Sequence, residues 1–219
     1  VNHPYERGRN LPRMAQKEQH MFTGLIQALG GLQSLEARGG DLRLRVSVAA
    51  EFLDGVREGD SIAVSGVCLT ALEIDQQGFA ADVSIETLNC TALGALQPGA
   101  RLNLERSLTL ATPLGGHFVS GHVDGLGRVR TIRADARSQR WQFDAPPELR
   151  RYIARKGSIA IEGVSLTVNE LDEDGFGVNL IPHTLAHTNL GQLREGAAVN
   201  LEIDLIARYV ERLLEARGT

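Results

Sequence analysis

Hydrophobic and polar residues alternate along much of the chain. In one run Leu42, Leu44 and Val46 are separated by Arg43 and Arg45, the pattern of a β-strand with one buried and one solvent-facing side. The same alternation recurs at Ile62 and Val64, Trp141 and Phe143, Ile159 and Ile161, and Val199, Leu201 and Ile203. Glycine-containing segments separate most of these runs. The pattern predicts antiparallel strands that close, or nearly close, into a barrel.

The sequence contains an internal repeat with a period of 97 residues. Residues 61–70 read SIAVSGVCLT, and residues 158–167 read SIAIEGVSLT. Of the 45 positions from 61 to 105, 22 are identical to their partners from 158 to 202 without a gap, whereas unrelated segments would share about three. A unit of this length is a small domain. We expect one barrel domain at 21–117, a second at 118–203, and a disordered extension over the polar residues 1–20.

Three segments predict helices. Two are short, at 51–56 and 147–155, and Pro147 suits a first helical position. In the last segment, 204–219, Asp204 is a suitable N-cap and Gly218 a suitable stop. Apolar residues recur there at helical spacing, namely Leu205, Ile206, Tyr209, Val210, Leu213 and Leu214. This stripe either packs back on a barrel or joins copies of the chain in an oligomer, and we favour the oligomer.

Composition narrows the class of protein. With 42% hydrophobic and 23% charged residues and a net charge of −4, the chain is typical of a globular protein. The basic residues form no block, which argues against a nucleic-acid partner, and no apolar run approaches the roughly 20 residues of a membrane span. The first twenty residues lack the apolar region of a signal peptide. Cys68 and Cys90 are too few for a disulfide scaffold, so a reducing cytoplasm is the default location.

The repeat singles out Cys68, whose counterpart is Ser165. Each follows Gly-Val and precedes Leu-Thr, so both copies would present a small polar side chain to similar ligands. The alternative is a small, half-buried residue beside a turn glycine. The equivalent pairs Glu86-Thr87 and His183-Thr184 would hydrogen-bond a heterocycle or, equally well, serve as helix caps or turn residues.

Four histidines lie in two short motifs, His117 with His122 and His183 with His187. The absence of nearby cysteine and the strand-like surroundings disfavour zinc. Proton transfer near neutral pH is the better hypothesis, with His122 as the candidate because it follows a glycine at an expected pocket rim. The sequence has no dinucleotide-binding fingerprint, phosphate-binding loop or serine nucleophile elbow. Hydride transfer on a Rossmann scaffold and nucleotide hydrolysis are therefore disfavoured.

Several motifs together resemble the riboflavin synthase family of tandem lumazine-binding repeats. They are MFTGLI at 21–26, GVCLT at 66–70, GGH at 115–117, SGH at 120–122, GVSLT at 163–167 and Ile181-Pro182. The resemblance implies an all-β fold of two six-stranded antiparallel Greek-key barrels plus a C-terminal helix that assembles a homotrimer. It also implies that two molecules of 6,7-dimethyl-8-ribityllumazine exchange a four-carbon unit, giving riboflavin and 5-amino-6-(D-ribitylamino)uracil. The family uses no metal and no dissociable cofactor, and lumazine synthase is a further partner that the resemblance suggests.

The same resemblance implies the site residues, with one lumazine in each of two facing pockets from adjacent chains. Catalytic candidates are Cys68, Thr70, His122, Ser165 and Thr167. The substrate-binding candidates are Gly24, Leu25, Ile26, Cys68, Leu69, Thr70, Asp82, Val83, Ser84, Ile85, Glu86, Thr87, Gly121, His122, Val123, Lys156, Ser165, Leu166, Thr167, Asn179, Leu180, Ile181, Pro182, His183 and Thr184. His183 stands where the family often has glutamate, which leaves that polar contact open. The alternative function is a lumazine- or flavin-binding antenna protein without turnover; a pure interaction module would not need the repeated polar positions.

Overall fold

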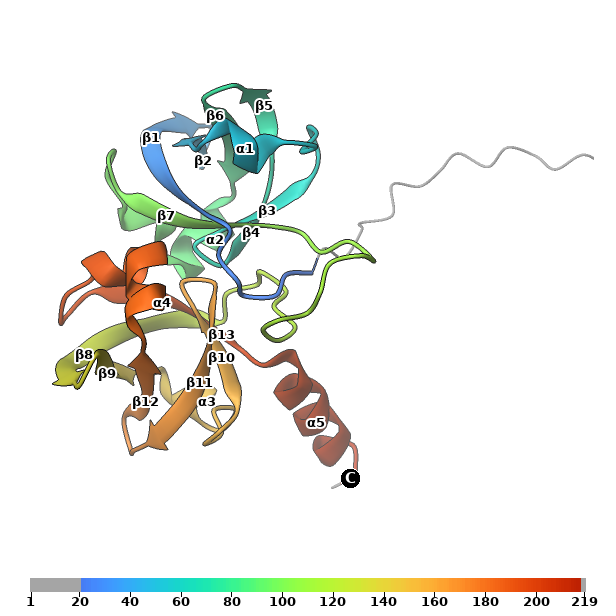
Figure 1. The fold of residues 1–219 in the computed structure, drawn as a ribbon. Helices are drawn as coiled ribbons and strands as arrows, with labels where there is room; N and C mark the ends of the chain where they lie inside the picture. Colours follow the sequence, from blue (N-terminus) through green and yellow to red (C-terminus); the bar gives the residue numbers. More distant parts are fainter. Residues whose placement is uncertain (1–20, 218–219) are drawn as a thin grey trace, which may run out of the picture.

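A computed structural model describes residues 21–217, which form two β-barrel units and a C-terminal helix that projects from the second unit (Figure 1). The predicted extension at 1–20 and the predicted helix stop at Gly218 lie outside the described residues. The alternating runs of the sequence are strands, as predicted.

The first unit is an antiparallel sheet with the strand order β4-β3-β7-β1-β2-β6-β5. Its elements are β1 (Ala28–Arg38), β2 (Asp41–Ser47), α1 (Ala50–Leu53), β3 (Ser61–Val64), β4 (Val67–Thr70), β5 (Leu72–Asp75), β6 (Gly78–Val83), α2 (Ile85–Cys90), the 3-10 helix η1 (Ala92–Ala95) and β7 (Arg101–Arg106).

The second unit is a closed barrel with the order β10-β11-β12-β9-β8-β13. Its elements are β8 (Gly125–Asp135), β9 (Ser138–Asp144), α3 (Pro147–Arg150), β10 (Ser158–Ile161), β11 (Val164–Leu171), β12 (Gly175–Leu180), α4 (Pro182–His187), the 3-10 helix η2 (Asn189–Gln192) and β13 (Ala198–Ile203). Each of these elements begins and ends 97 residues after its counterpart in the first unit, except β11, whose counterpart is divided in two. The duplication seen in the sequence is therefore a duplication of structure.

The two units differ at one strand. β11 is continuous, whereas its counterpart is divided into β4 and β5 at Ala71, and Glu73 adopts a left-handed φ of 45°. Since β4 and β5 are the two ends of the first sheet, the first unit has the same six-strand arrangement with one strand interrupted. The prediction of two six-stranded barrels is confirmed for the second unit. The sheet of the first unit has seven strands, and its two end strands, β4 and β5, do not pair to close the barrel.

Both barrel interiors are filled by side chains. Leu44, Val46 and Phe79 are fully buried in the first unit. In the second, Phe143 stacks between Trp141 and Phe176, with ring centroids 6.0 and 5.5 Å apart. Barrels of this size have just enough interior volume for their own side chains. Any ligand must therefore bind outside the barrels.

The C-terminal helix α5 (Leu205–Glu215) begins as predicted, because the carboxylate of Asp204 accepts the N–H of Ile206 at 3.0 Å. Its apolar stripe stays exposed at Ile206, Tyr209, Val210, Leu213 and Leu214. The interpretation that this stripe packs back on a barrel is therefore wrong for the single chain. The helices α1 and α3 are both shorter than predicted, although Pro147 does open α3.

Glycine is required where the units touch on their pseudo-twofold axis. A Cβ added to Gly66, whose φ is +83°, would lie 2.7 Å from the backbone nitrogen of Gly163. Gly163, its counterpart in the repeat, has a φ of +77° and the reciprocal contact. Only glycine fits so close an approach of two backbones in a left-handed conformation.

Candidate active site

The two units exchange their N-terminal segments. We call residues 22–26 the first strap and residues 119–123, their counterparts, the second strap. Phe22 and Val119 pair as an antiparallel bridge, with N–H to O distances of 2.7 and 3.1 Å. Beyond this bridge each strap crosses over: Ile26 packs against the core of the second unit and Val123 against that of the first.

Hydrogen bonds fix this exchange at the positions that the repeat singled out. The backbone N–H of Ser165 donates to Gly24 O at 2.8 Å, and the N–H of Cys68 donates to Gly121 O at 2.8 Å. The repeated segment Val-Cys/Ser-Leu-Thr therefore binds, in each half, the strap of the other half. The structure brings the predicted residues together as two cross-paired sets.

The carboxylate of a buried glutamate accepts hydrogen bonds from each strap. Glu105 accepts the N–H and hydroxyl of Thr23 at 2.7 and 2.6 Å and the N–H of Gly24 at 2.9 Å. Glu202, its counterpart, accepts the equivalent groups of Ser120 and Gly121 at 2.6, 2.8 and 3.0 Å. Burial raises the pKa of both carboxyls, that of Glu202 to about 7. Neither glutamate is among the predicted site residues, although the two occupy the same position of the repeat.

The polar candidates lie on the outer faces of the barrels. In β4 the buried Val67 and Leu69 alternate with the half-buried Cys68 and the exposed Thr70, so the last two point outward. Asp82 is exposed on β6, which lies against β4. We call this outward-facing group, with the second strap beside it, the first pocket.

The second pocket repeats this arrangement. Thr167 of β11 lies beside Asn179 of β12, because each is next to a residue of the ladder pair Val168–Val178. Ser165 lies two residues before Thr167 and shares its face of the strand. The first strap contributes Leu25, which is 49% exposed. In both groups the outward-facing strand residues are exposed, namely Thr70, Asp82, Thr167 and Asn179.

Ser165 is hydrogen-bonded to a histidine that the sequence did not single out for proton transfer. The Ser165 hydroxyl lies 2.7 Å from Nδ1 of the buried His117. Nε2 of His117 is buried and has no hydrogen-bond partner among residues 21–217. Burial lowers the pKa of His117, opposed by the charge of Asp204, so the neutral imidazole predominates at neutral pH. A neutral ring in contact with a hydroxyl is suited to accept its proton.

Cys68 has a different environment. Burial raises the pKa of its thiol, the nearby Glu202 raises it further, and a hydrogen bond with Ser61 partly opposes both. The thiol is therefore protonated at neutral pH, which argues against a thiolate nucleophile. It is suited to orienting a ligand by a weak hydrogen bond.

The Asp82 carboxylate forms an ion pair with Arg43 of the neighbouring strand β2. Nε and Nη2 of Arg43 donate to its two carboxylate oxygens at 2.6 and 2.8 Å, and this pairing holds the pKa of Asp82 below its usual range. Asn179, at the same place in the second pocket, is neutral. The pockets thus differ in charge as well as in the exchange of Cys68 for Ser165.

The other predicted residues lie at the rims. Ser84–Thr87 and Ile181–Thr184 surround the starts of α2 and α4, two helices that the sequence analysis did not predict. Their signals were Ser84, whose hydroxyl accepts the N–H of Thr87 at 3.3 Å, and Pro182 in the first turn of α4. His122 is exposed, and its role in proton transfer stays a prediction. Lys156 is also exposed, on a turn with a φ of 68°.

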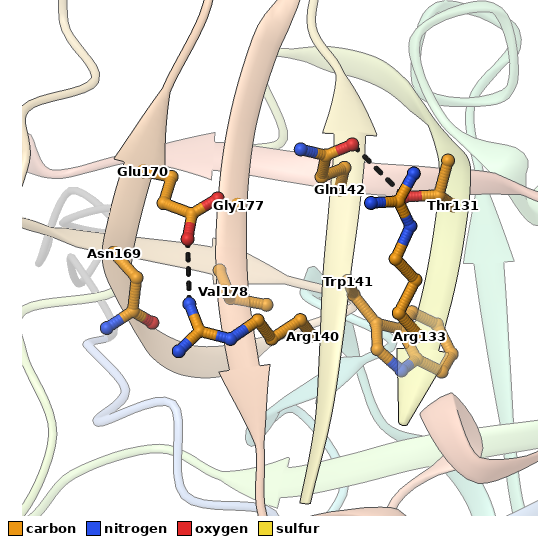
Figure 2. A pocket seen from close by; sticks show the side chains of 9 residues that line it. All are labelled: Thr131, Arg133, Arg140, Trp141, Gln142, Asn169, Glu170, Gly177 and Val178. Carbon is orange, nitrogen blue, oxygen red and sulfur yellow. Dashed lines mark hydrogen bonds and ion pairs between the residues drawn. The ribbon is translucent and has the colours of Figure 1, made fainter. Parts of the chain in front are cut away.

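A separate small cavity of about 60 Å³ lies on the outer face of β8, β9, β12 and β11 (Figure 2). Arg140 pairs across it with Glu170 at 2.7 Å, and Thr131 donates to Gln142 at 3.1 Å. The lining that the structure describes contains no predicted site residue. Within residues 21–217, no helix is long and apolar enough to cross a membrane, and no cluster of three metal-ligating side chains occurs.

Comparison with known proteins agrees with the geometry. The model of the lumazine binding domain matches residues 23–107 and again residues 120–204. These two matches define the chain as a tandem lumazine-binding-domain protein.

Curated relatives narrow the class. A riboflavin synthase from Mycobacterium tuberculosis is 44% identical over 205 residues, covering 90% of this chain and 100% of the relative. One from Photobacterium phosphoreum is 39% identical over 194 residues, 89% of each chain. A crystal structure of LumP complexed with riboflavin superposes with a TM-score of 0.78 at 26% identity, covering 83% of this chain and 98% of the other. The chain belongs to the riboflavin synthase family.

Proposed function

We propose that this protein catalyses the dismutation of two molecules of 6,7-dimethyl-8-ribityllumazine to riboflavin and 5-amino-6-(D-ribitylamino)uracil, as a transferase of a four-carbon unit. The observation that carries the proposal is the pair of homologous outer-face pockets, each built from one barrel and the strap of the other. A reaction between two copies of one molecule needs two similar sites. Holding both copies in place removes the entropy cost of their encounter.

The residues take the following roles in this proposal. Ser165 and His117 relay a proton from the lumazine in the second pocket: the hydroxyl oxygen of Ser165 takes the lumazine proton while the hydroxyl's own proton passes to Nδ1 of His117, which becomes imidazolium. Cys68 and Thr70 orient the lumazine in the first pocket. The domain boundaries 21–117, 118–203 and 204–219 belong to the same proposal, as does a cytoplasmic location.

The open pockets support assembly through α5. Such exposed polar surfaces would exclude water only when another surface faces them, and the exposed apolar stripe of α5 provides a contact between copies. We therefore propose a homotrimer in which pockets of neighbouring chains face each other. Sedimentation of the purified chain and of Leu213→Glu tests it: the first should show the trimer mass and the second a smaller one. Association with lumazine synthase would appear as co-sedimentation.

The activity test uses the purified protein with 6,7-dimethyl-8-ribityllumazine and no added metal or cofactor. We expect riboflavin and the pyrimidine in equal amounts. Ser165→Ala and His117→Gln should each lower kcat by roughly a hundredfold, the range of general acid–base catalysis. Ser138→Ala, which changes the first residue of β9, should keep wild-type turnover. Wild-type kcat in both site variants would contradict the assigned roles.

The second candidate is binding of a lumazine or flavin without turnover. The three LumP structures, complexed with 6,7-dimethyl-8-ribityl lumazine, riboflavin and flavin mononucleotide, favour it because they share the fold at TM-scores of 0.75 to 0.78. Stoichiometric binding with no riboflavin formed would establish this second function and reject the first.

A further inference from the structure

The second strap ends at a carboxylate that joins three parts of the fold. Asp124 directly follows the strap, and its side chain is 3% exposed. Its Oδ2 accepts the N–H of Ile203 at 2.8 Å, and its own N–H donates to Leu201 O at 2.8 Å. Its Oδ1 pairs with the guanidinium of Arg208 on α5. Strap, last strand and C-terminal helix therefore meet at one side chain.

The repeat shows that this connection is particular to the second half. Gln27 is the counterpart of Asp124, and Arg106 is the counterpart of Ile203. Oε1 of Gln27 accepts the N–H of Arg106 at 3.1 Å and its Nε at 3.3 Å. The first strap is thus tied to a cationic residue of its own barrel. In the second half that residue is isoleucine, and the guanidinium comes from α5 instead.

The electrostatics make the second strap depend on this guanidinium. A nearly buried carboxylate is unfavourable unless a cation and hydrogen bonds compensate its lost hydration. Without Arg208, Asp124 would keep only the Ile203 N–H among the contacts described for its carboxylate. The Asp124 carboxylate would then regain hydration by moving toward the solvent, and this movement would shift the strap residues before it. Among these, Gly121 binds the Cys68 backbone and Val123 packs in the first core.

The helix itself does not depend on Arg208. Glu211 of α5 pairs with Arg151 at 2.7 Å and also contacts the hydroxyl of Tyr152. These contacts attach α5 to the segment that follows α3, independently of Asp124. Changing Arg208 therefore perturbs the strap while leaving a second attachment of the helix intact.

We propose that the Asp124–Arg208 ion pair positions the second strap and so couples the place of α5 to the shape of the first pocket. Arg208 is a positioning residue: it acts on the ligand through Asp124 and Gly121–Val123. The proposal rests on the function proposed above, since it assigns a role in binding the lumazine of the first pocket. Through this ion pair, a surface that binds α5 would change the affinity of the first pocket for its ligand.

The test compares Arg208→Gln with Arg212→Gln. Arg212 lies one turn further along α5, is 80% exposed and pairs only with Glu215 among the described residues. Arg212→Gln therefore removes the same charge from α5 without removing a contact to the strap. We would measure KM and kcat for 6,7-dimethyl-8-ribityllumazine, the sedimentation mass, and amide hydrogen exchange in peptides covering 119–124. Arg208→Lys serves as the conservative rescue.

We expect Arg208→Gln to raise KM and to accelerate exchange at 119–124, each about five- to tenfold, as for loss of one charge-assisted hydrogen bond. Its kcat should stay within about twofold and its mass unchanged, and Arg208→Lys should recover most of both effects. Identical KM and exchange in Arg208→Gln and Arg212→Gln would overturn the coupling. So would a changed mass with unchanged strap exchange. If the wild type forms no riboflavin, the proposed function fails, yet the exchange comparison still decides whether α5 holds the strap.

Discussion

The buried carboxyl of Glu202 makes the stability of this protein depend on pH. Its pKa is about 7 in the folded chain, raised by burial from an ordinary value of 4.5. A raised folded-state pKa stabilises the fold below the unfolded value, and this contribution is lost as pH rises through the folded value. At about 1.4 kcal/mol for each tenfold change, the rise from 4.5 to about 7 corresponds to roughly 3 kcal/mol. The loss should fall between about pH 4.5 and pH 7.

Urea unfolding at a fixed protein concentration measures this effect. The single tryptophan, Trp141, is buried in the second core and reports unfolding by its fluorescence. Between pH 5 and 8 the free energy of unfolding of the wild type should fall about 2.5 kcal/mol more than that of Glu202→Gln, in which the group cannot ionise. Glu173→Gln, at an exposed turn, should follow the wild type.

Parallel pH profiles for the wild type and Glu202→Gln would refute the reasoning, because they would mean that Glu202 ionises equally well in both states. If Glu202→Gln does not fold, carbon NMR of the labelled glutamate carboxyls in the wild type decides the same point. The carboxyl assigned to Glu202 should titrate near pH 7. Titration of that carboxyl near 4.5 would again refute the reasoning.

Two further variants test the packing. Gly66→Ala should destabilise the protein by more than about 2 kcal/mol, since the added Cβ would meet the Gly163 backbone and the φ is left-handed. As a control, Gly39→Ala, with a φ of +62° but nothing within 4 Å, should cost about 1 kcal/mol. Equal losses of unfolding free energy in urea for the two variants would contradict the argument. Phe176→Ala removes a fully buried ring and should cost about 3–5 kcal/mol, whereas Leu171→Ala, 48% exposed, should cost under about 1 kcal/mol.

The sequence predicted the repeat and most strands because both are local or self-similar signals. Leu44 and Val46 alternate with arginines, and the offset of 97 recurs in the structural elements. The short helices α2 and α4 escaped because a six-residue helix has too few turns for a period to register. The break of the first barrel at Ala71 escaped because Leu69 and Leu72 are apolar on both sides of it.

The strap exchange could not be read from the chain. Thr23-Gly24 aligns with Ser120-Gly121 in the repeat, but the alignment says nothing about which barrel a segment packs against. That choice depends on contacts distant in sequence, such as Ile26 in the second core and Ser165 N–H to Gly24 O. His117 was passed over for the same reason. Its proximity to Ser165, 48 residues away, exists only once the strap has crossed over.

The exchange also explains why the two pockets are alike yet not equal. Because each strap leaves its own half, a single repeat unit cannot complete its own pocket, and a second copy must supply the missing strap. Once both copies lie in one chain, the two halves can diverge. Cys68 corresponds to Ser165 in the repeat, and the ion-paired Asp82 corresponds to the neutral Asn179. Among the contacts described for the two straps, only that of the second strap reaches α5. Two copies of one substrate would thus meet different surroundings, as a dismutation needs if one is to give and the other to receive.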